Sequence, residues 1–207
     1  AMLPCACGSL SKKLRLKPMT NVKNIEAEVR GLLSKDEFDV LNSFLSKNSI
    51  FKQKKERVLI DFSSGVRDRK KDIRVRETNG IPEIIIKLGA WGGSEKREEI
   101  SIHTEKGSFD DLVRAFGELG YTKGVLCVRN SLVYDYKNVE FALVEVPGHS
   151  YYFEAEILAT AVDAHKAEAE LLALCEELKL KTFTDEGFYA YIETLNREAN
   201  SIFDYAK

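Results

Sequence analysis

The sequence predicts an α+β protein built on a closed or strongly curved antiparallel sheet. About eight or nine short segments alternate between apolar and polar residues, which is the period of a β-strand. Turn residues such as Asn79-Gly80 separate neighbouring segments, and Asn-Gly between two strand patterns is a strong hairpin signal. A few amphipathic helical segments interrupt and follow the strands. This combination favours a barrel or a curved sheet with helices packed against it.

In the first half of the chain, the helices and strands are predicted from the hydrophobic period and from helix-capping residues. A strand is expected over residues 25–31, and Ser34 with Glu37 forms a capping box that begins a helix. The apolar residues of this helix recur on one face, as in an amphipathic helix. Further strands are expected over residues 58–62, 73–77, 83–88 and 97–103.

The second half repeats the pattern and ends in helices. Ser108 is expected to cap a helix, and two more helices are expected from about residue 160 to 178 and over 185–196. Because no linker rich in Pro, Gly or Ser occurs, we expect a tail over residues 1–21 and a single domain over 22–207. The remaining strands are expected over residues 124–129, 132–136, 141–146 and 151–158.

Composition restricts the classes of function. An apolar content of 44% supports a buried core, and a formal net charge of -2 gives no general attraction to nucleic acid or to a membrane surface. The four cysteines include no Cys-x-x-Cys pair, and no apolar run approaches the roughly 20 residues that span a bilayer. We therefore expect a cytoplasmic protein with no nucleic-acid or membrane partner. Any electrostatic function is expected to come from local clusters of charged residues and not from the net charge.

Two pairs of carboxylates stand out, because Glu is disfavoured in strands. Glu26 and Glu28 are two residues apart, as are Glu154 and Glu156, so each pair lies on one face of its strand. For a single pair, a solvent-facing strand is the simpler interpretation. Two pairs favour a metal site, because clustered carboxylates repel one another without a cation and their hard oxygens suit Mg²⁺ or Mn²⁺.

Basic residues with the same spacing accompany the acids. Arg74 and Arg76 share a strand face, and Arg30 follows the first acidic pair. Alone, such residues more often form a solvated face. Together they favour a phosphate site, because guanidinium groups match phosphate oxygens and several enclosed cations demand an anion such as a triphosphate. The candidate phosphate-binding residues are Arg30, Arg74, Arg76, Lys87, Arg97 and Arg129.

Other motifs carry less weight. The basic runs 52–57 and 67–71 lack interleaved aromatic residues, so a solvated hairpin is preferred over a nucleic-acid contact. The glycines around Trp91 match no dinucleotide or Walker pattern, and Trp91 is expected to cover a sheet edge. The strand faces leave two arrangements open. The charges face solvent over an apolar core, or they face a wet channel while the apolar residues pack outward against helices.

These motifs, taken in order, resemble those of the CYTH superfamily of triphosphate tunnel metalloenzymes. That superfamily includes class IV adenylyl cyclases, thiamine triphosphatases and inorganic triphosphatases. Glu26-x-Glu28-x-Arg30 is similar to its Glu-x-Glu-x-Lys motif, and the resemblance continues through residues 73–76, 85–87, 96–99 and 153–157. It implies an eight-stranded antiparallel β tunnel with a charged interior and helices outside, which selects the channel arrangement.

The resemblance also implies roles for individual residues. Glu26, Glu28, Glu154 and Glu156 would hold Mg²⁺ or Mn²⁺, and the candidate cations would bind phosphate oxygens. Glu26, Glu28 and Glu99 would form the catalytic set, with Glu99 orienting basic residues or assisting a metal. The implied partner is a small-molecule triphosphate (inorganic, thiamine or nucleoside), bound by a monomer or a homodimer.

The implied function is metal-dependent hydrolysis of the terminal phosphate of inorganic triphosphate or of a small organic triphosphate. Two alternatives stay open: a class IV adenylyl cyclase that makes cyclic AMP and pyrophosphate from ATP, and a tunnel that binds polyphosphate or nucleotides with little turnover. The chain departs from the family pattern at Arg30, which replaces Lys, at Ser131, where a second basic residue is usual, and at Val144, near which an Asp is common. The last two changes keep the binding-only tunnel open.

Overall fold

A computed structural model describes residues 24–63, 65–67 and 69–206, so the tail predicted over residues 1–21 lies outside the described residues. The elements are β1 (Asn24–Leu33), α1 (Lys35–Asn48), β2 (Ile50–Asp61), β3 (Lys71–Thr78), β4 (Ile81–Leu88), β5 (Ser94–His103), α2 (Phe109–Glu118), β6 (Lys123–Tyr136), β7 (Val139–Val146), β8 (Ser150–Thr160), α3 (Ala164–Glu177), α4 (Asp185–Glu198) and β9 (Ser201–Asp204). Of the helices that the structure describes, none is both long and apolar enough to cross a membrane.

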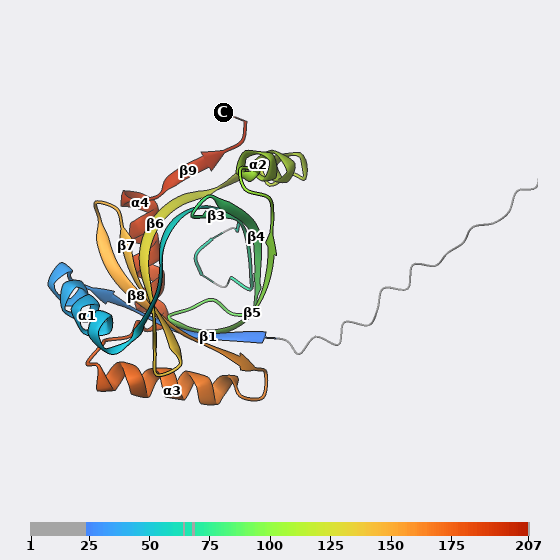
Figure 1. Ribbon diagram of the computed structural model, residues 1–207. Coiled ribbons are helices and arrows are strands. Elements are labelled where there is room, and N and C mark those ends of the chain that lie inside the picture. Colours follow the sequence, from blue (N-terminus) through green and yellow to red (C-terminus); the bar gives the residue numbers. More distant parts are fainter. Residues whose placement is uncertain (1–23, 64, 68, 207) are drawn as a thin grey trace, which may run out of the picture.

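Eight of the described strands close into a ring. The neighbours run in the order β2-β3-β4-β5-β1-β8-β7-β6, and β6 pairs back onto β2 to complete the circle. Every pairing in the ring is antiparallel. Figure 1 looks into this ring, with α1, α2 and α3 on its outside and β9 attached to β6 beyond it. The predicted α+β tunnel fold is confirmed.

The apolar core lies outside the ring, between the strands and the helices. Val29 and Phe153, on the outward faces of β1 and β8, are fully buried, and they pack in one cluster with Leu45 of α1 and Leu171 of α3. Because residues alternate sides along a strand, the intervening glutamates of β1 and β8 are left to face the interior of the ring. The hydrophobic effect therefore drives the helices onto the outer surface and leaves the inner surface charged.

Strand β2 is longer than the sequence predicts. It begins at Ile50 and stays paired with β6 through Lys55 opposite Ser131 and Arg57 opposite Arg129. The sequence does not predict this half of β2 because the strand has solvent on its outer face and a polar cavity on its inner face. It therefore shows no apolar alternation. The two strands expected over 124–129 and 132–136 are one continuous strand, β6, and β9 was not predicted.

Helix α4 packs against one end of the ring, where it contacts the glycine-rich turn before β5. The Gly93 N–H donates to Asp185 Oδ1 at 2.9 Å, and the Tyr189 hydroxyl donates to the Trp91 carbonyl at 2.7 Å. A Cβ on Gly93 would lie 2.7 Å from the carbonyl oxygen of Phe183, so only glycine permits this approach. Trp91 is buried here and packs on Phe188 of α4.

Candidate functional site

The ring encloses two adjoining cavities. The first, here the carboxylate cavity, has a lining that consists almost entirely of charged residues. The second, here the aromatic cavity, is lined partly by residues of α4. Four side chains line both cavities and so mark their junction: Arg30, Arg57, Arg74 and Glu154.

Three carboxylates gather on the wall formed by β1 and β8. Glu28 lies directly opposite Glu156, and Glu26 shares the face of Glu28. One carboxylate oxygen from each of the three lies within 4.8 Å of the others. Oxygen donors at this spacing fit the ligand preference of Mg²⁺ or Mn²⁺. The structure thus brings together three of the four predicted metal ligands.

The electrostatics of this cluster also fit a cation. Burial, reinforced by the nearby Glu26 carboxylate, raises the pKa of Glu156 to about 7. Burial also raises the pKa of Glu28 well above its usual range, against the opposing effect of Arg30. Both carboxylates therefore hold protons more tightly than they would in water. A bound divalent cation would reverse that preference, because it stabilises the ionised form.

Lys87 supplies part of the missing positive charge. Its ammonium contacts Glu26 and lies 3.9 Å from Glu28 and 3.2 Å from Glu99. Burial lowers the pKa of Lys87, but Glu28, Glu26 and Glu99 outweigh burial and raise it to about 12. The predicted catalytic residue Glu99 therefore lies where it can orient Lys87, and it also lies 4.0 Å from Arg76.

The fourth predicted metal ligand, Glu154, is placed differently. Its carboxylate accepts a hydrogen bond from Arg30 Nε at 3.3 Å and is not part of the three-carboxylate cluster. Burial raises the pKa of Glu154, but Arg30, Arg57 and Lys87 together lower it below the usual value. Glu154 is therefore an ionised residue at the junction, held by arginine.

Three predicted phosphate-binding arginines line the carboxylate cavity, and each is held by acids. Arg30 lies 2.6 Å from Glu95 and also contacts Glu28 and Glu154. Arg74 Nη2 lies 2.7 Å from Asp72, and Arg76 Nε lies 2.6 Å from Glu83. These ion pairs hold the guanidinium groups in place, so the wall is formed before any ligand arrives.

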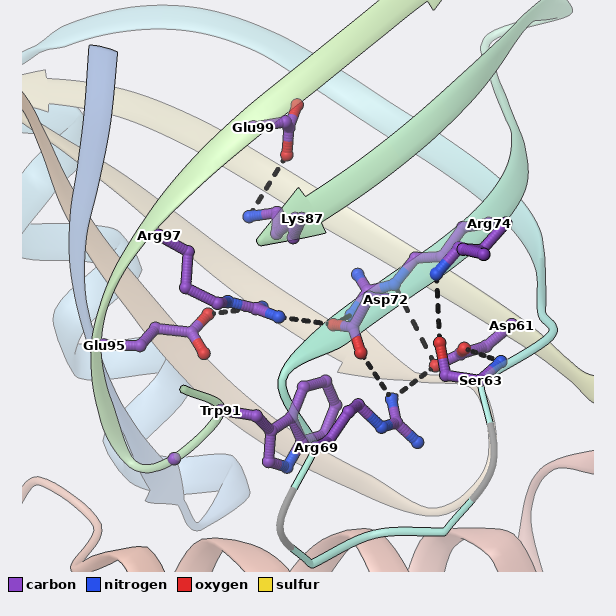
Figure 2. A network of polar contacts seen from close by, with 12 residues as sticks. Asp61, Ser63, Arg69, Asp72, Arg74, Lys87, Trp91, Glu95, Arg97 and Glu99 are labelled. Carbon is purple, nitrogen blue, oxygen red and sulfur yellow. Dashed lines mark hydrogen bonds and ion pairs between the residues drawn. The ribbon is translucent and has the colours of Figure 1, made fainter. Parts of the chain in front are cut away.

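Arg97 lies behind the cavity wall and not in its lining. The side chain is 1% exposed and bridges Asp72 and Glu95, with its Nη2 2.7 Å from Glu95. Figure 2 shows Asp72 at the centre of this network, with Arg97, Arg74 and Arg69 converging on it. Buried charges are tolerated only when they are paired, and here each cation has an acid beside it. Arg97 is thus connected to the cavity lining through Asp72, which also holds Arg74, and through Glu95, which also holds Arg30.

Arg129 lines the aromatic cavity, not the carboxylate cavity. Its Nη2 donates to Asn200 Oδ1 at 3.0 Å, and its Nη1 donates to the Val128 carbonyl at 2.7 Å. Of the predicted phosphate-binding residues, Arg129 therefore lies beyond the junction, in the aromatic cavity alone.

Sequence reasoning missed two cations in this wall. Lys55 and Arg57 of β2 line the carboxylate cavity, so the prediction that the run 52–57 is a solvated hairpin was wrong for these two residues. They lie opposite Ser131 and Arg129 on β6. Positive charge therefore does occur beside Ser131, but the neighbouring strand supplies it.

A carboxylate on β7 was also missed. Glu140 lines the carboxylate cavity, lies opposite Glu156 and is 3.2 Å from Lys55 Nζ. Val144, on the same strand face, is buried opposite Tyr152. The signal that could have found Glu140 is its even spacing from Val144, which places both residues on the inner face.

The aromatic cavity combines cations with rings. Arg69 lies over the ring of Trp91, with 4.2 Å between the guanidinium carbon and the ring centroid, and its Nη1 is 2.7 Å from Asp61. Tyr152 and Tyr191 complete the wall toward α4. This end of the passage suits an anion with an organic part more than it suits a bare metal ion.

Comparison with known proteins supports the fold assignment. No protein-family model and no curated protein sequence matches the chain. Among solved structures, the PH1819 protein from Pyrococcus horikoshii OT3 is 21% identical and superposes with a TM-score of 0.62, covering 82% of this chain and 99% of its own. HpAC1 from Hippeastrum, a candidate adenylyl cyclase with a dominant triphosphatase activity, is 16% identical with a TM-score of 0.53, covering 78% of this chain and 90% of its own.

A third match is a candidate adenylate cyclase from Vibrio parahaemolyticus. It is 16% identical with a TM-score of 0.56, and the alignment covers 76% of this chain and 90% of that one. The chain therefore shares its fold with these proteins, and the fold that the resemblance of the sequence motifs implied is confirmed.

Proposed function

We propose that this protein is a metal-dependent triphosphatase that cleaves the terminal phosphate of inorganic triphosphate or of a small organic triphosphate. The observation that carries the proposal is the carboxylate cavity. It contains three carboxylates within 4.8 Å of one another and, facing them, a wall of preorganised basic side chains. Acids that suit a metal and bases that suit phosphate oxygens, enclosed together, fit a metal–triphosphate complex.

In this proposal Glu26, Glu28 and Glu156 hold Mg²⁺ or Mn²⁺. The metal, when bound, would supply positive charge to the phosphate oxygens and make a bound water more acidic. Glu154 keeps Arg30 in place at the junction, and Glu99 orients Lys87. The residues that would contact phosphate oxygens are Arg30, Arg74, Arg76, Lys87 and Arg129.

The reaction is displacement at the terminal phosphorus. The oxygen of a water molecule forms a bond to phosphorus and releases a proton to solvent, and the bond to the bridging oxygen breaks. Pyrophosphate, or the organic diphosphate when the substrate is an organic triphosphate, leaves with the electron pair of that bond. Negative charge accumulates on the equatorial and leaving oxygens in the transition state. The guanidinium and ammonium groups stabilise that charge most when they are already oriented, as the ion pairs to Asp72, Glu83 and Glu99 ensure.

Hydrolysis is favoured over cyclisation by one comparison. HpAC1 carries the name of an adenylyl cyclase and yet has a dominant triphosphatase activity. A cyclase additionally requires ATP to be held with its 3′-hydroxyl aligned on the α-phosphorus, and hydrolysis has no such requirement. Cyclic AMP formation is therefore an outcome to be tested alongside hydrolysis.

Product identification tests the proposal. Purified protein is incubated with inorganic triphosphate, ATP or thiamine triphosphate, each with Mg²⁺ or Mn²⁺, and phosphate and nucleotide products are separated by ion-exchange chromatography. Orthophosphate that no longer forms when EDTA is added supports the triphosphatase. Cyclic AMP with pyrophosphate would replace it by the cyclase. Absence of any product from the folded protein would refute both enzymes and favour the binding-only tunnel.

A further inference from the structure

The cations that line the two cavities differ in whether an acid neutralises them. Most have a carboxylate within ion-pair distance. Examples are Lys55 at 3.2 Å from Glu140, and Arg69 at 2.7 Å from Asp61. The other neutralised cations are Arg30, Arg74, Arg76 and Lys87. Among the residues that the structure describes, two cations in the cavity linings lack an ion pair, Arg57 and Arg129.

Arg57 is the more exceptional of the two. Its Nε is buried and has no hydrogen-bond partner within the described part of the chain. Burial, together with the nearby Arg76, lowers its pKa, and Glu154 opposes that change. Thr78, directly opposite Arg57 on β3, also carries a buried hydroxyl without a partner among the described residues. A buried cation without an acid costs stability, so an unpaired arginine in a cavity points to a missing anion.

The two unpaired cations lie side by side. The β2–β6 ladder places Arg57 opposite Arg129, and directly opposite residues have Cβ atoms roughly 4.5–5.5 Å apart. Arg129 donates to Asn200 and to its neighbouring carbonyl, both of which are neutral acceptors, so neither hydrogen bond supplies a negative charge.

The position of Arg57 fixes where an anion would sit. Arg57 lines both cavities, and Arg129 lines the aromatic cavity beyond it. The pair therefore lies at the junction and on its far side, whereas the three-carboxylate cluster lines only the carboxylate cavity. The three-carboxylate cluster and the two unpaired cations thus lie in different parts of one passage.

We propose that Arg57, with Arg129 beside it, forms a clamp that binds a phosphate group of the ligand at the junction of the two cavities. This inference rests on the proposed function and names a substrate-binding residue for it. One ligand that contacts both the clamp and the carboxylate cluster must carry several linked anionic groups. The preferred ligand is accordingly a chain of phosphates and not a single orthophosphate.

Binding of inorganic triphosphate in EDTA, measured by isothermal titration calorimetry, tests the clamp without turnover. We expect Arg57→Gln to weaken binding about tenfold or more, because the ionised hydrogen bonds to phosphate are lost. The affinity of Arg57→Lys should lie between those of the wild type and Arg57→Gln, since Lys keeps the charge but lacks the forked set of guanidinium donors. Lys54→Gln is the matched control: it removes the same charge from an exposed position of the same strand and should bind as wild type.

Urea unfolding of the ligand-free protein separates binding from a structural role. Arg57→Gln should unfold at the same or a higher urea concentration than wild type, whereas Arg76→Gln, which strands Glu83, should unfold at a lower one. The clamp alone would be overturned if Arg57→Gln lowered the urea concentration of unfolding as much as Arg76→Gln does, or if Arg57→Gln left the affinity for triphosphate unchanged. A wild-type protein that neither binds nor hydrolyses triphosphate would overturn the proposed function as well.

Discussion

Replacing Glu156 by Gln is expected to stabilise the metal-free protein while it damages the site. Glu156 lies with Glu26 and Glu28 in the three-carboxylate cluster, and its pKa is raised from an ordinary value of 4.5 to about 7 by burial and by Glu26. Because the folded state binds this proton more tightly than the unfolded state, the stabilising contribution is complete below pH 4.5. It is lost as the pH rises through about 7.

The size of the effect follows from the two pKa values. One pKa unit corresponds to about 1.36 kcal/mol, so the raised pKa of Glu156 costs the folded state about 3 kcal/mol at pH 8, where the carboxyl is ionised. At pH 5 the cost is about 1 kcal/mol, because the carboxyl is then ionised mainly in the unfolded state. Gln has nearly the same volume and stays neutral at every pH. The variant Glu156→Gln should therefore gain about 3 kcal/mol over wild type at pH 8 and about 1 kcal/mol at pH 5.

Urea denaturation in EDTA at the two pH values, followed by circular dichroism, measures this difference. Glu176→Gln is the control, because it makes the same change on the exposed face of α3 and should alter stability equally little at both pH values. Equal stability of Glu156→Gln and wild type at pH 8 would refute the reasoning, because burial and Glu26 would then not raise the pKa of Glu156 in the folded state.

Three other perturbations have definite expected outcomes. Mg²⁺ at about 100 times its Kd should stabilise the wild type by about 2.7 kcal/mol in thermal denaturation and Glu156→Gln by much less; equal stabilisation of both would place the metal elsewhere. Asp72→Asn should cost about 3–5 kcal/mol in urea unfolding, because Arg69, Arg74 and Arg97 all pair with Asp72; a loss below 1 kcal/mol would contradict that network. Gly93→Ala should lower the melting temperature and loosen α4, because the new Cβ meets the Phe183 carbonyl; an unchanged melt with unchanged protease resistance of α4 would contradict the close docking.

Much of the tunnel could be predicted from the sequence where one face of a strand is apolar. In β1, Ala27 and Val29 alternate with Glu26 and Glu28, so the face of each glutamate follows from the period alone. Strand β2 lacks this contrast between Lys55 and its neighbours, because both faces are wet. Its inner cations were therefore missed.

Depth along the tunnel could not be predicted. Arg97 and Glu99 share a face of β5, yet Glu99 lines the carboxylate cavity and Arg97 is buried behind it. The two side chains differ in burial because Asp72, a residue of β3, forms an ion pair with Arg97 behind the cavity wall. The two-residue period of a strand predicts which face a side chain lies on. The ion-pair partner of a long side chain lies on another strand, and the register of the closed ring determines which partner that is.

The central claim, a metal-dependent triphosphatase built on the three-carboxylate cluster, is tested most directly by orthophosphate release from inorganic triphosphate in Mg²⁺, compared between wild type and Glu28→Gln. The account predicts release by the wild type that EDTA abolishes, and release reduced by two or more orders of magnitude, roughly, in a folded Glu28→Gln protein. Equal release by both proteins, or release that persists in EDTA, would contradict it.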